Sequence, residues 1–189
     1  MSEKASERPK VAAILRVVIG PPALLIAAAL QGVRVTGPIT LSLAHPAPPW
    51  SLILSDVLSV VVLATVAFWG ASVVAGRRSP VAGFILPVAA SQLPMAAAAV
   101  LVGRDIQGWA MNRALGAGGA EVLAAPGPAL APFVPAAIGV VVLTAVAAGI
   151  LYVGYCRATR ATGFRVALSF AGGLVAAEVL CRAWFLWTG

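Results

Sequence analysis

Charged side chains are scarce in this chain of 189 residues. Only 10% of the residues are Asp, Glu, Lys or Arg, whereas 61% are hydrophobic. A soluble domain is nearer one quarter charged, because polar groups must cover its surface. Long apolar runs with few charges are instead typical of membrane-spanning helices. The composition therefore predicts an integral membrane protein that has the lipid bilayer as its surroundings.

Histidine and cysteine are almost missing as well, with one and two copies. A single histidine, His45, excludes a bis-histidine haem or a multi-histidine metal site within one chain. The chain also has no G-x-S-x-G motif for a nucleophilic serine and no Gly-rich phosphate loop with its lysine. Cys156 and Cys181 fall in different apolar runs at opposite depths, so we expect no disulfide. We predict a protein that is not an enzyme, with no cofactor and no metal.

Acidic residues are few compared with basic ones, and the formal net charge is +7. The basic residues lie between apolar runs, as the positive-inside rule requires, so we expect no nucleic-acid partner. Arginine is the dominant base beside much alanine, valine and glycine, which favours a bacterial cytoplasmic (inner) membrane. With a cytoplasmic N-terminus, eight bases face the cytoplasm and three the outer side. The eight are Lys4, Arg8, Lys10, Arg77, Arg78, Arg157, Arg160 and Arg165, and the three are Arg34, Arg104 and Arg113.

Apolar runs divide the chain into predicted membrane spans. Residues 1–10 are a polar tail that we expect to be disordered, and residues 11–189 form one transmembrane domain. The predicted fold class is all-α, a polytopic membrane helical bundle of five helices, with four or six as alternatives. The Pro21–Pro22 pair predicts either a kink in the first run or an interfacial turn before a span that begins near Pro21. The spans cover residues 11–33, 52–76, 81–103, 133–156 and 166–187, with loops at 34–51 and 104–132.

Three charged residues fall inside these spans. Charged groups at such depth are costly and usually face the interior of the bundle. Glu178 and Arg182 are four residues apart, hence on one helix face, and Asp56 lies at a depth similar to that of Arg182. We expect Arg182 to pair with Glu178, with Asp56 or with both, and so to tie the second predicted span to the fifth. A proton or ion path through the three residues is the alternative.

The Glu178-x-x-x-Arg182 spacing is similar to an element of the CAAX-protease-like membrane family. The chemistry of that family needs paired glutamates and two further intramembrane histidines. Position 177 is Ala, and His45 lies in a proline-rich loop. These departures exclude the protease mechanism.

Two stretches resemble bacterial members of the Yip family, which are Rab-interacting, five-span membrane proteins. Residues 68–103, "FWGASVVAGRRSPVAGFILPVAASQLPMAAAAVLVG", are similar to the family's second span, polar turn and third span with a late proline, here Pro94. Residues 151–170, "LYVGYCRATRATGFRVALSF", are similar to its aromatic and glycine positions, basic turn and final span. The D-L-Y-G-P signature of eukaryotic members is missing, so Rab binding is not carried over.

The resemblance implies a non-enzymatic role in membrane organisation, as a scaffold or as an accessory subunit of a membrane complex. The expected partner is another membrane protein or a second copy in a homo-oligomer, and no soluble substrate is identified. The alternative function is a small transporter or channel subunit with Asp56, Glu178 and Arg182 on a polar path. A transporter requires that these residues, with Ser91 and Gln92, line one continuous cavity. A scaffold requires only that they bond to one another in separate pairs.

Overall fold

The structure, a computed structural model, describes residues 19–44, 48–77, 79–103 and 134–188. Four long apolar helices dominate this part of the chain, and a shorter apolar helix, Ile19–Gln31, precedes them. Each long helix has 20 to 26 residues, about 30 Å or more at 1.5 Å per residue, enough to cross the hydrocarbon core. The protein is thus a polytopic membrane protein. The long helices are α2 (Trp50–Val74), α3 (Ala82–Leu101), α7 (Val134–Thr159) and α8 (Phe164–Thr188).

The first predicted span, at 11–33, is described only in its second part. Its described part is the Ile19–Gln31 helix, which is too short to cross a bilayer. This helix begins halfway along the bundle, since Gly20 lies against the carbonyl oxygen of Ala89 in the middle of α3. It ends at the level of Gly103, which lies against Gln31. Within the described residues it therefore spans only half the depth of the bundle; residues 11–18 lie outside them.

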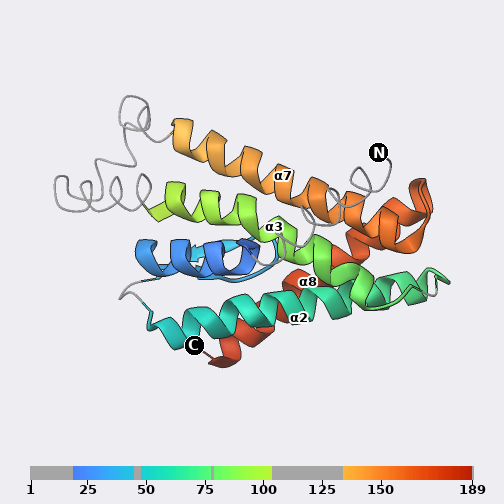
Figure 1. The fold of residues 1–189 in the computed structure, drawn as a ribbon, viewed down its shortest axis with the longest axis horizontal. Coiled ribbons are helices and arrows are strands. Elements are labelled where there is room, and N and C mark those ends of the chain that lie inside the picture. The colour runs from blue at the N-terminus through green and yellow to red at the C-terminus, as the bar shows by residue number, and fades with distance from the viewer. Residues whose placement is uncertain (1–18, 45–47, 78, 104–133, 189) are drawn as a thin grey trace, which may run out of the picture.

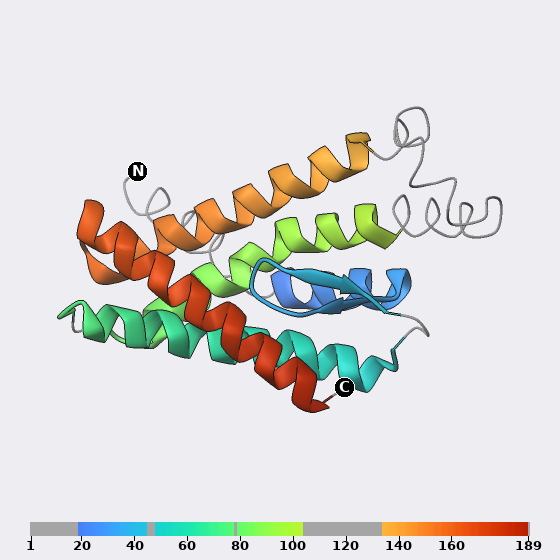
Figure 2. The ribbon, with the colours of Figure 1, turned by 180° about the vertical axis from the view of Figure 1, so that it is seen from behind.

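The four long helices form two side-by-side pairs, α2 with α8 and α3 with α7 (Figures 1 and 2). The α2–α3 turn and the α7–α8 turn lie at the same end of the bundle. Each turn contains a glycine with positive φ, Gly76 at 73° and Gly163 at 104°, a conformation that glycine adopts without steric cost. We call this end the basic end because Arg77, Arg157, Arg160 and Arg165 lie in or beside its turns. We call the opposite end, where α8 terminates, the hairpin end.

Aromatic packing joins the two helix pairs near the basic end. Phe68 of α2 stacks on Phe170 of α8, with ring centroids 5.5 Å apart, and meets Tyr155 of α7 edge-on at 6.0 Å. Phe84 of α3 contacts the same tyrosine at 5.6 Å. The Ser169 hydroxyl donates to the Ala71 carbonyl at 2.8 Å, so the Tyr155 hydroxyl, 2.6 Å away, must donate to Ser169. This aromatic cluster (Phe68, Phe84, Tyr155 and Phe170) thus draws on all four long helices.

The predicted loop at 34–51 is wrong in its first part, which is a β-hairpin, so the fold is not purely helical. Strand β1 (Val33–Val35) pairs antiparallel with β2 (Leu41–Leu43), and Arg34 faces Ser42 across the ladder. A turn closes the hairpin: the Thr40 N–H donates to the Gly37 carbonyl with Pro38 at the second position, which proline favours. The hairpin (residues 33–43) lies between the α2–α8 pair and the α3–α7 pair at the hairpin end (Figure 2).

Candidate functional site

The intramembrane charges gather around the hairpin. Asp56 of α2 accepts two hydrogen bonds from Arg34 of β1, from Nε at 2.8 Å and from Nη2 at 2.9 Å. Both residues are buried, with 7% of Arg34 and 2% of Asp56 exposed. The guanidinium also lies over the ring of Phe185 in α8, 4.1 Å from its centroid. The planar fork of arginine suits such a bidentate and stacked arrangement, so this ion pair joins β1 to α2 and α8.

The expected pairing of Asp56 with Arg182 is therefore wrong. The partner of Asp56 is Arg34, which sequence reasoning placed in an outer loop. The hairpin carries Arg34 back into the bundle, to the level of the first turns of α2, and there it occupies both carboxylate oxygens. Asp56 does tie α2 to its surroundings, but through the hairpin and not directly through a charge on α8.

Glu178 of α8 holds the tip of the hairpin. One of its oxygens accepts from the Ile39 backbone N–H at 3.2 Å and the other from the Thr40 hydroxyl at 2.7 Å. Gly37 leaves room for this approach, because a Cβ atom there would overlap the carboxylate. A backbone N–H at membrane depth needs a protein partner since the hydrocarbon offers none. Glu178 supplies that partner for Ile39.

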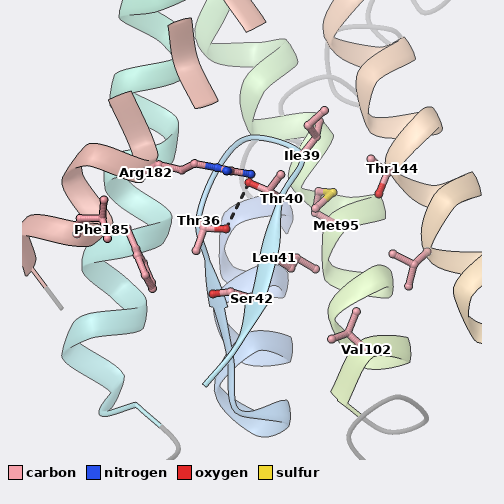
Figure 3. Close-up of a pocket in the computed structure, with 12 residues that line it drawn as sticks. Thr36, Ile39, Thr40, Leu41, Ser42, Met95, Val102, Thr144, Arg182 and Phe185 are labelled. Atoms are coloured by element: carbon pink, nitrogen blue, oxygen red, sulfur yellow. Dashed lines mark hydrogen bonds between the residues drawn. The ribbon is translucent and has the colours of Figure 1, made fainter. Parts of the chain in front are cut away.

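Arg182 makes no ion pair with Glu178, contrary to expectation. Within the described ranges, the one salt bridge is that of Arg34 with Asp56, and Arg182 has no hydrogen bond. Glu178 is directed to the hairpin tip instead, where each of its oxygens accepts one hydrogen bond. Arg182 instead lines a cavity of about 580 Å³, which we call the lateral cavity (Figure 3). Its lining residues are Thr36, Ile39, Thr40, Leu41, Ser42, Met95, Val102, Val140, Thr144, Arg182, Phe185 and Leu186.

Ser91 and Gln92 of α3 are separate from this cavity. Both are fully buried, and both donate to the Val88 carbonyl within their own helix, at 2.7 and 3.3 Å. Asp56 and Glu178 do not line the cavity either. The five polar residues that a continuous path would need are thus divided among a salt bridge, a hairpin contact, intrahelical bonds and one cavity.

Arg34, Thr36, Thr40 and Ser42 were not among the predicted site residues, although the sequence contains a signal for them. In "VRVTGPITLSL", residues 33–43, apolar and polar side chains alternate on both sides of a Gly-Pro turn. That period of two is typical of paired strands. Val33 and Val35 are buried in the core beside the Ile19–Gln31 helix. The alternating polar positions then fall on the opposite face of the hairpin, toward the charges and the cavity.

Comparison with models of known families, with curated proteins and with solved structures finds no match for this chain. No group of three potential metal-ligating side chains lies together in the described residues. The class that the fold and the site define is a polytopic membrane protein with a hairpin held inside its helices by charged groups.

Proposed function

We propose that this protein is a non-catalytic membrane scaffold or accessory subunit of a membrane complex. The observation that carries the proposal is the engagement of both carboxylates, the buried Asp56 and the half-buried Glu178. All four oxygens of Asp56 and Glu178 accept hydrogen bonds from the hairpin. Hydrogen bonds to fixed groups hold a carboxylate in one place. Such groups stabilise a structure and are poorly suited to carry protons or activate water.

The same geometry weighs against the alternative of a transporter or channel subunit. A conducting path needs polar groups in sequence from one face to the other. Here the lateral cavity lies at the hairpin end, and the aromatic cluster packs between the four long helices near the opposite end. Ser91 and Gln92, which lie between the two ends, bond to their own helix.

The Yip-like stretches support the scaffold function in this proposal. Residues 68–103 contain the end of α2, the turn at the basic end and the whole of α3, and residues 151–170 contain the end of α7, the second turn and the start of α8. By the positive-inside rule we place that end in the cytoplasm of a bacterium. The partner is a membrane protein or a second copy of this chain.

Crosslinking in the native membrane tests the proposal. A tagged full-length chain, with photo-reactive residues at the lipid-facing Val141 and Val175 (68% and 63% exposed), is irradiated in cells and read by mass spectrometry. We expect one stoichiometric membrane protein, or a self-crosslink, at either position. Crosslinks to lipid alone, from both positions, would contradict the scaffold function.

A flux assay tests the transporter alternative directly. The protein in liposomes should carry no proton or ion current above that of empty liposomes. A current that Glu178→Gln abolishes and the exposed-site control Arg77→Gln preserves would establish the transport alternative instead.

A further inference from the structure

Arg182 is a cation without a partner in the part of the chain that is described. It lies six residues before Thr188, the end of α8, which is about 9 Å along the helix at 1.5 Å per residue. An arginine at such depth usually extends toward the headgroups. Figure 3 shows a different direction: the side chain extends across the cavity mouth toward Thr40 at the hairpin tip. The side chain is exposed, lines the cavity, and its N–H donors have no acceptor among the described residues.

The rest of the polar lining also fits an anion. Arg182 is the one charged side chain among the described residues that line the lateral cavity. Hydroxyl groups of Thr36, Thr40 and Ser42 come from the hairpin, and Thr144 comes from α7. The Ser42 Oγ is buried and has no hydrogen-bond partner among the described residues. The Thr36 hydroxyl donates to Thr40 and the Thr40 hydroxyl to Glu178. The donors that face carboxylate or phosphate oxygens are therefore the guanidinium and the Ser42 and Thr144 hydroxyls.

The remaining lining is apolar and adjoins the lipid. Seven apolar residues complete the cavity: Ile39, Leu41, Met95, Val102, Val140, Phe185 and Leu186. α7 and α8 meet closely at the basic end and diverge toward the hairpin end (Figure 2). Leu186 is 80% exposed in the bundle, so in a bilayer this wall faces hydrocarbon. A hydrocarbon chain can lie along it while its polar head reaches Arg182.

We propose that the lateral cavity binds an anionic amphiphile, with its phosphate or carboxylate group on Arg182 and its acyl chain between α7 and α8. The cavity volume of about 580 Å³ lies in the range of small-molecule sites. Arg182 supplies the charge, the Ser42 and Thr144 hydroxyls supply further donors, and the divergence of the helices supplies access from the bilayer. This site is independent of the scaffold function, because a bound lipid is compatible with either a scaffold or a transporter.

Ligand titration of the full-length protein in a neutral detergent tests the proposal. The probes are dioleoyl phosphatidylglycerol, oleate, dioleoyl phosphatidylcholine and inorganic phosphate, and native mass spectrometry reads the bound fraction. We expect phosphatidylglycerol or oleate to bind at least about tenfold more tightly than phosphatidylcholine, as for one charge-assisted pair of about 1.4 kcal/mol. Phosphatidylglycerol alone would identify a phosphate head, and oleate alone a carboxylate. Equal binding of inorganic phosphate would overturn the need for an acyl chain, and with it the proposal.

Variants locate the binding in the cavity. Arg182→Gln should weaken binding about tenfold and leave the melting temperature near that of wild type, since no protein group loses a partner. Arg77→Gln, at the exposed basic end, is the matched control and should bind like wild type. Thr144→Val, nearly isosteric on the α7 wall, gives a second test if Arg182→Gln does not fold, and we expect a few-fold loss. Equal affinity in wild type, Arg182→Gln and Thr144→Val would overturn the site.

Discussion

The two ends of this bundle are held together by different interactions. Near the basic end, four long helices meet through the aromatic cluster, with ring centroids 5.5 to 6.0 Å apart. At the hairpin end, the same helices are separated by a short helix and a β-hairpin. Charged side chains there join the hairpin to α2 and α8. One end relies on the fit of side chains, the other on charged hydrogen bonds.

The difference follows from what lipid provides as a solvent. Regular helices satisfy their own backbone, so their association needs only close packing, which aromatic rings and small residues supply. A hairpin tip leaves N–H groups that lipid cannot satisfy. The Ile39 N–H is such a group, and Glu178 accepts from it. Irregular backbone inside the bundle therefore accounts for a charge that a purely helical region would not contain.

The largest expected effect comes from removing the buried acid at the hairpin end. Asp56→Ala leaves the Arg34 guanidinium buried without a counter-ion, so we expect a loss of about 3 to 5 kcal/mol of unfolding free energy. Equilibrium unfolding by SDS in mixed micelles measures it. The double variant Arg34→Met, Asp56→Leu is the control and should recover most of the loss, because no charge is then buried. A double variant as unstable as Asp56→Ala would mean that the pair itself, and not the orphaned charge, decides stability.

The matching change at the basic end is Phe68→Ala. It removes a ring that touches Tyr155 and Phe170 and leaves a cavity, at a cost of about 3 kcal/mol. The same unfolding assay applies. Val74→Ala at the end of the same helix, where Val74 is 89% exposed, should stay within about 0.5 kcal/mol of wild type. If the two variants were equally stable, the aromatic cluster would not hold this end together.

A smaller effect is expected at the hairpin tip from Gly37→Ala. The added Cβ overlaps the Glu178 carboxylate and the Thr40 hydroxyl, so the tip must shift, at about 1 to 3 kcal/mol. Hydrogen exchange of the Ile39 amide should accelerate as its bond to Glu178 lengthens. Gly70→Ala, where a Cβ meets nothing within 4 Å, is the matched control and should leave this exchange unchanged. An unaltered Ile39 amide in Gly37→Ala would show that the tip does not depend on this approach.

The smallest expected effect is that of Tyr155→Phe. It keeps the ring contacts and removes the hydroxyl that bonds to Ser169 at 2.6 Å, so about 1 kcal/mol should be lost. A double-mutant cycle with Ser169→Ala measures the coupling, which we expect to be about the same size. If the losses of the two single variants simply add, the two hydroxyls are not coupled, and ring packing alone stabilises the basic end.

Much of the fold could be predicted from hydropathy. The predicted spans at 52–76, 81–103, 133–156 and 166–187 correspond to α2, α3, α7 and α8 within three residues at each end, because about 20 apolar residues are a local property of the chain. The hairpin was not predicted, although apolar and polar residues alternate along it. Each strand has only three residues, which is too short for alternation to outweigh the prolines that indicate a loop. Arg34 consequently went unnoticed as a partner.

The sequence by itself determined that this is a membrane protein, where its four long spans lie, and that Asp56, Glu178 and Arg182 are the charges to explain. Only the tertiary structure decided how those charges are used. Which carboxylate meets which donor depends on the path of residues 33–43 between two helix pairs. That path is set by contacts between elements up to 139 positions apart, and spacing along one helix does not encode it.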